Sequence, residues 1–149
     1  MLKKITIAGL VSGTISGVLL GCYLWMVEAL TDKQVYTLLL NVDFIPILAG
    51  YEQQLIEWLF HVIISWAIGV VYCFYLWKKQ IFSWKKRLLA AAGIAAVAAA
   101  TYFPLTILFI QEIESPDDLL ALGYWVSGHA LFAYVLAITV NIYCSSKSK

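Results

Sequence analysis

Charged residues are scarce in this sequence. They make up 13% of its 149 residues, whereas about 25% is typical of a soluble domain. Apolar residues make up 62%, which is more than a water-soluble fold of this size can bury. The shortage of charge therefore excludes a soluble domain and predicts a membrane protein.

Cysteine and catalytic motifs are also sparse. The three cysteines form no Cys-x-x-Cys pair, so neither a disulfide framework nor a thiolate metal site is indicated. The sequence has no phosphate-binding glycine loop, no Gly-x-Ser-x-Gly and no His-Glu-x-x-His. No enzymatic activity and no nucleic-acid partner are therefore indicated.

Four apolar runs are long enough to cross a membrane, which takes about 20 residues of helix. We predict a single all-α transmembrane domain over residues 1–149, built as a four-helix bundle. The main partner of such a domain is the lipid bilayer that surrounds it. The predicted spans are Ile5–Leu30, Leu55–Trp77, Leu88–Ile110 and Leu119–Ile142.

The basic residues predict the orientation of these spans. Nine of the ten lysines and arginines precede the first run, separate the second from the third, or follow the fourth. Lys33 and all nine acidic residues lie on the opposite side. Because basic loops stay in the cytoplasm, we expect both termini to be cytoplasmic. Trp25, Trp58 and Trp125 would then mark the outer interface of the membrane.

Glycine recurs at every fourth position of the first run. Gly9, Gly13, Gly17 and Gly21 share one helical face and predict close approach of a second helix. That helix could belong to the same chain, to a second copy in a homo-oligomer, or to a partner membrane protein. In the third run, Pro104 removes a backbone hydrogen bond and predicts a kink.

The connection after the first run is too apolar for an ordinary loop. Thr31 and Gln34 are spaced like a helix N-cap. We predict a short amphipathic helix from about Asp32 to Leu40, lying on the outer interface or capping the bundle.

Titratable residues inside the predicted spans form the candidate site. The only two histidines, His61 and His129, lie about 10–13 Å below the outer boundary of their spans. Glu57 is one helical turn from His61, and Glu28 is near the outer end of the first span. Such groups normally face the protein interior or a water-filled cavity. We expect an outward-opening polar layer made by Glu28, His61 and His129, with Glu57 near its mouth.

Four interpretations of this layer stay open. It could be a hydrogen-bonded structural cluster, or a proton- or ion-responsive site, since imidazole titrates near neutral pH. Two histidines with one or two glutamates also suit zinc or iron. The fourth is a membrane redox protein in which His61 and His129 ligate haem.

Several short motifs together resemble one bacterial family. They are Trp25-x-x-Glu28, "FHVIISWAIGVVYC" at 60–73, Phe103–Leu105 and "SGHALF" at 127–132. On these residues the chain resembles the YagU-like inner-membrane proteins. The resemblance implies a small multi-span protein of the bacterial plasma membrane and supplies no reaction. It includes Glu28, His61, Pro104 and His129, but not Glu57.

Overall fold

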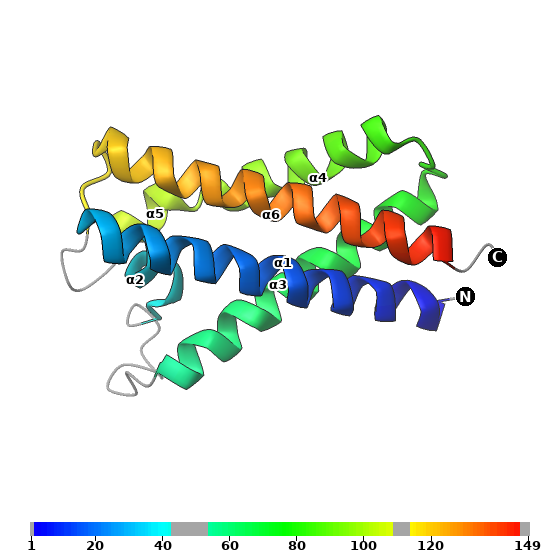
Figure 1. The fold of residues 1–149 in the computed structure, drawn as a ribbon, viewed down its shortest axis with the longest axis horizontal. Helices are drawn as coiled ribbons and strands as arrows, with labels where there is room; N and C mark the ends of the chain where they lie inside the picture. The colour runs from blue at the N-terminus through cyan, green and yellow to red at the C-terminus, as the bar shows by residue number, and fades with distance from the viewer. Residues whose placement is uncertain (1, 43–53, 109–113, 147–149) are drawn as a thin grey trace.

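The computed structural model describes residues 2–42, 54–108 and 114–146, and these form helices and their connections (Figure 1). The elements in chain order are α1 (Leu2–Thr31), α2 (Val35–Leu40), α3 (Gln54–Lys78), α4 (Trp84–Ala99), α5 (Tyr102–Leu108) and α6 (Leu119–Ser146).

Four segments are long and apolar enough to span a membrane, which confirms the predicted all-α architecture with four spans. They are Leu2–Thr31, Gln54–Lys78, Trp84–Leu108 and Leu119–Tyr143. The predicted end of the third span at Ile110 lies outside the described residues. That span begins earlier than predicted, at Trp84, so Arg87 belongs to a helix rather than to the preceding loop. Lysine and arginine favour helix formation, so the helix can begin before the apolar run by which hydropathy identifies the span.

The two ends of the bundle differ in charge. Figure 1 shows both chain termini at one end, together with the turn between α3 and α4. We call this the basic end, because Lys3, Lys4 and Lys78–Arg87 lie there. The opposite end carries α2 and the start of α6. We call it the acidic end, because Glu28, Glu57 and Asp118 lie there.

The third span is interrupted four residues before its proline, where α4 ends and α5 begins. Pro104 has no N–H to donate, so the helical ladder cannot continue unbroken through this turn. The Thr101 hydroxyl donates to the Ala98 carbonyl at 2.6 Å, and the Trp125 indole donates to the Ala99 carbonyl at 2.9 Å. A side chain from α6 therefore satisfies one of the carbonyls at the break.

The interior of the bundle holds small polar side chains beside large apolar ones such as Leu24, Tyr72 and Phe132, and further large aliphatic side chains cover its outside. Ser12, Ser16 and Ser65 are each at most 2% exposed. Large apolar side chains are exposed along every span, including Ile15, Val18, Ile63, Val71, Leu89, Val97, Ile107 and Val126. An exposed apolar belt of this kind fits lipid, and a soluble monomer would not carry it.

The glycine face of α1 lies directly against α3. A Cβ added to Gly9 would lie 2.5 Å from Val70 Cα, and one on Gly13 would overlap the Ser65 carbonyl. Gly17 and Gly21 are equally close to the side chains of Ser65 and Trp58. The absence of side chains at these glycines lets the two helices approach closely, so α3 of the same chain occupies this face.

The short helix α2 fills the acidic end between α1 and α3, which diverge there (Figure 1). It begins at Val35, later than predicted, and Val35 and Leu38 are fully buried. The expected N-cap from Thr31 is absent. Gln34 is the N-cap residue of α2, and the Thr31 hydroxyl accepts from the Lys33 amide at 3.4 Å, before the helix begins. The buried side chains show that α2 packs into the bundle.

Candidate functional site

His61 lies in the acidic half of α3 and points toward α1. It is 7% exposed, and its Nε2 lies 2.9 Å from the carbonyl oxygen of Gly17. A Cβ on Gly17 would overlap the Ser65 hydroxyl oxygen, so glycine here permits the close approach of α3 that brings the imidazole to the α1 backbone. The Trp58 ring meets the imidazole edge-on, with ring centroids 5.7 Å apart. Trp58 is one turn before His61 on the same helix, so the helix itself positions this pair.

His129 occupies a matching place on α6. It is 6% exposed, and its Nδ1 lies 2.8 Å from the carbonyl oxygen of Trp125. The Trp125 ring lies over the imidazole, with centroids 4.7 Å apart and planes inclined by 38°. Both histidines of the chain are therefore buried, each beside a tryptophan of its own helix.

The two histidines line one cavity of about 480 Å³, a size typical of small-molecule sites. Most of its wall is apolar. Ser65 and Thr101 bring hydroxyl groups, and Leu39 of α2 also lines the cavity. The wall also includes Ile64 of α3 and Val97 of α4, which are 57% and 74% exposed. The open side of this histidine cavity therefore lies between α3 and α4.

The hydrogen bonds of the histidines fix their neutral tautomers. A carbonyl oxygen can only accept, so Nε2 of His61 and Nδ1 of His129 carry the protons when the rings are neutral. The remaining nitrogens, Nδ1 of His61 and Nε2 of His129, are lone-pair acceptors. Each is chemically able to bind a proton, a hydrogen-bond donor or a metal ion.

Glu28 does not line the histidine cavity. Its carboxylate instead accepts three hydrogen bonds at the N-terminus of α2. Oε2 accepts from the amides of Tyr36 and Thr37 at 2.8 and 2.9 Å, and Oε1 accepts from the Thr37 hydroxyl at 2.7 Å. The two amides are among the N–H groups that lack an intrahelical partner at the start of a helix, and these favour a negative partner. The structure therefore gives Glu28 an anchoring contact with α2.

Glu57 lies in the first turn of α3, is half-buried and is absent from the wall of the histidine cavity. Of the four predicted site residues, His61 and His129 are therefore brought together, while Glu28 and Glu57 lie nearer the acidic end.

A charged cluster at the acidic end ties α2 to α6. The Lys33 ammonium donates to Asp118 Oδ2 and lies 3.9 Å from Glu114, and the Gln34 amide donates to Glu114 at 2.8 Å. The hydrogen bond to Asp118 raises the pKa of Lys33, and the same bond lowers the pKa of Asp118. Asp118 also caps α6 by accepting from the Ala121 amide at 2.9 Å.

Two contributors to the site were not predicted from the sequence. Trp125 was expected at the membrane interface, but it is 1% exposed and bridges the broken third span to His129. Trp58 likewise has a partner within the protein, since its indole N–H donates to the Tyr36 hydroxyl at 2.9 Å. The signal available in the sequence was spacing, because each tryptophan precedes a histidine by about one helical turn.

Haem and metal binding depend on the two lone-pair nitrogens. Within residues 2–42, 54–108 and 114–146, no group of three or more His, Cys, Asp or Glu residues could hold a metal ion. The predicted ligand set of two histidines with glutamates is therefore not assembled in this part of the chain. The pair His61 and His129 matches bis-histidine haem ligation in ligand type.

Comparisons with protein-family models, with curated proteins and with solved structures find no match.

Proposed function

We propose that this chain is a multi-pass protein of the bacterial plasma membrane with both termini in the cytoplasm. The apolar exterior of four span-length helices supports the membrane setting. The gathering of basic residues at the end that holds both termini supports the orientation. The acidic end, including α2, then faces outward. Membership of the YagU-like family is part of this proposal and rests on the motifs around Glu28, His61, Pro104 and His129.

The proposed function is a response to protonation of His61 and His129. The observation that carries it is the sharing of one largely apolar cavity by the only two histidines of the chain. They are also the only titratable side chains in its described wall. A proton bound by either ring places a full charge where the wall offers mainly hydrocarbon.

Protonation would change what the cavity must accommodate. The second ring nitrogen of each histidine becomes a donor and needs an acceptor. The wall offers the hydroxyls of Ser65 and Thr101, and the face of Trp125 can stabilise a cation on His129. Entry of water through the open side, or a shift of α3 relative to α4, would supply the remaining solvation. The protein would thus change conformation when a histidine is protonated, without catalysing a reaction.

Histidine NMR titration in detergent tests this function. The imidazole resonances of wild type are compared with those of His61→Gln and His129→Gln. Because both rings share one cavity, removing one should shift the titration midpoint of the other. If each histidine has the same titration midpoint in wild type and in the variant that lacks the other histidine, the proposal is contradicted.

A second candidate is haem ligation, favoured by the two lone-pair nitrogens in one cavity. Bound haem would supply redox chemistry, with Nδ1 of His61 and Nε2 of His129 as the available ligand atoms. The absorption spectrum of the purified chain decides between the candidates. A Soret band that is lost in His61→Gln and in His129→Gln would favour the haem site, whereas proton response requires no such band.

A homo-oligomer or a partner membrane protein also remains a proposal. The glycine face of α1 is filled by α3, so such a contact would use a different surface. The outer face of α4 is one such surface, since a Cβ added to Gly93 meets no neighbour within 4 Å.

A further inference from the structure

Arg87 is a buried cation at the basic end of the bundle. Its side chain is only 8% exposed although it lies in the first turn of α4. The guanidinium donates to the Asn141 side-chain oxygen at 2.8 Å and to the Ile81 carbonyl at 3.3 Å. The Tyr72 hydroxyl donates to the Arg87 carbonyl at 3.0 Å, which holds this turn in place. The Asn141 and Ile81 oxygens that accept from the guanidinium are neutral, so these hydrogen bonds leave its positive charge uncompensated.

The sequence offers no acidic side chain to neutralise this charge. All nine aspartates and glutamates lie within residues 28–57 or 112–118, at or near the opposite end of the spans. A helix the length of α1 extends about 45 Å, so those carboxylates cannot reach Arg87. A buried charge without a counter-charge is costly unless an anion comes from outside the chain.

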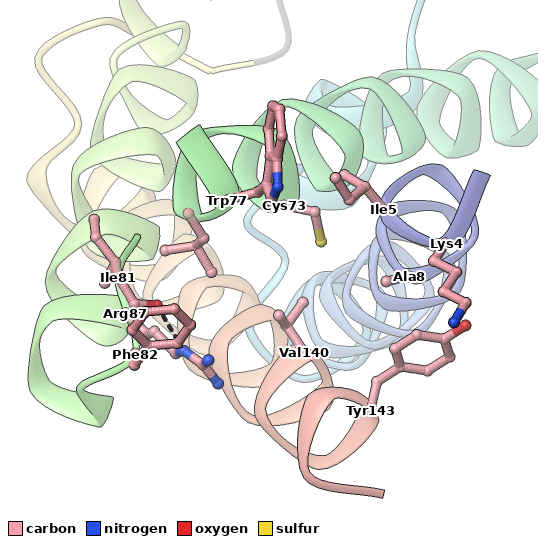
Figure 2. Close-up of a pocket in the computed structure, with 11 residues that line it drawn as sticks. Lys4, Ile5, Ala8, Cys73, Trp77, Ile81, Phe82, Arg87, Val140 and Tyr143 are labelled. Atoms are coloured by element: carbon pink, nitrogen blue, oxygen red, sulfur yellow. Dashed lines mark hydrogen bonds between the residues drawn. The ribbon is translucent and has the colours of Figure 1, made fainter. Parts of the chain in front are cut away.

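A pocket of about 300 Å³ lies beside Arg87 (Figure 2). Helices α1, α3 and α6 supply apolar walls, including Ile5, Ala8, Cys73 and Val140. Figure 2 shows Arg87 on one side of the pocket and Lys4 on the other. Among the described residues that line it, Arg87 and Lys4 are the charged ones, and both are positive. The pocket thus combines two cations with a hydrocarbon interior.

We propose that this pocket binds an anionic phospholipid from the cytoplasmic leaflet. The phosphodiester would accept hydrogen bonds from Arg87 and form an ion pair with Lys4. The start of an acyl chain would lie along the apolar walls. Arginine forms strong charge-assisted hydrogen bonds with phosphate oxygens, and basic pockets between spans on this side suit such headgroups. Net charge selects among lipids, because the ammonium of a zwitterionic headgroup cancels its phosphate and is repelled by both cations.

Lipid titration of the purified full-length chain tests this site. Delipidated protein in detergent is titrated with phosphatidylglycerol, phosphatidylcholine and inorganic phosphate, and bound lipid is measured by native mass spectrometry. Phosphatidylglycerol should bind roughly tenfold more tightly than phosphatidylcholine, and inorganic phosphate should neither bind comparably nor compete. Equal binding of the two lipids would overturn the proposal. Binding of inorganic phosphate as tight as that of phosphatidylglycerol would overturn it as well.

Charge-matched variants locate the binding. Arg87→Gln should weaken phosphatidylglycerol binding roughly tenfold and leave phosphatidylcholine unchanged. Lys85→Gln removes the same charge from an exposed residue outside the pocket and should retain wild-type binding within about twofold. Lys4 is exposed, so Lys4→Gln should fold normally even if Arg87→Gln does not, and it should weaken binding severalfold. If Lys4→Gln binds no more weakly than Lys85→Gln, the site is elsewhere.

Discussion

Glu28 and Thr37 are joined by two hydrogen bonds, one from the backbone amide and one from the hydroxyl of the threonine, at 2.9 and 2.7 Å. Together with the Tyr36 amide, they fasten the start of α2 to the end of α1. The Glu28 carboxylate, which was predicted to belong to the histidine site, therefore anchors the helix whose Leu39 lines the histidine cavity.

The first prediction concerns this anchor. Glu28→Gln removes the charge and leaves one oxygen to serve three donors, so the variant should lose about 1–2 kcal/mol of stability. Thr37→Val removes only the hydroxyl donor and should lose less. Thermal unfolding in detergent, followed by circular dichroism, measures both effects. Equal stability of Glu28→Gln and wild type would show that the anchor contributes nothing.

The second prediction uses two glycines in opposite settings. Gly13→Leu would drive a side chain into the Ser65 backbone and should cost about 1–3 kcal/mol or more, because neither helix can yield locally. Gly93→Leu makes the same change on α4, where the added Cβ meets open space. It should be neutral or stabilising by about 0.5–1 kcal/mol, since leucine favours helix over glycine. Matching melting temperatures for the two variants would refute the packing of α1 on α3.

The third prediction concerns pH and the Lys33–Asp118 pair. The lowered pKa of Asp118 means that its contribution to stability is present above 3.8 and is lost as pH falls through the folded value. The raised pKa of Lys33 means that its contribution is present below 10.5 and is lost as pH rises further.

Melting temperature measured between pH 2.5 and 7 tests the acid side of this pair. Lys33→Gln should lower the melting temperature at neutral pH and flatten its fall in acid. The matched variant Lys85→Gln should keep the wild-type profile, because Lys85 lies at the other end of the bundle. An acid slope that is unchanged in Lys33→Gln would argue against the pair.

The fourth prediction concerns orientation in the membrane. In a chain whose native cysteines are replaced by alanine, Ser115→Cys at the acidic end should react with a membrane-impermeant maleimide on intact cells. Ser83→Cys at the basic end should react only after the membrane is permeabilised. Both positions are exposed, so access to the reagent is set by sidedness. The reverse labelling pattern would invert the proposed topology.

The spans were predictable because they depend on local properties. Length and hydropathy identify a spanning helix without knowledge of its neighbours. The break before Pro104 likewise follows from the missing N–H of that residue.

Contacts between distant segments were not predictable in this way. The position of Trp125 along its span suggested the membrane interface, but depth does not say which side of a helix faces the bundle. Arg87 was assigned to a loop because it is charged, whereas its burial depends on Asn141, which is 54 residues away. Glu28 was grouped with the histidines because of its depth, the cost of placing a titratable group in lipid, and its position in the family-like motifs. Its actual partners belong to a six-residue helix whose exact start the sequence did not fix.

The open side of the histidine cavity has a consequence for any molecule that enters it. Because Ile64 and Val97 flank the opening on the exterior of the bundle, the cavity meets lipid tails there. A visiting molecule would be drawn from solution in the bilayer, where its concentration equals the aqueous concentration multiplied by its partition coefficient. Among molecules of equal fit, the most lipid-soluble would therefore occupy the cavity at the lowest aqueous concentration.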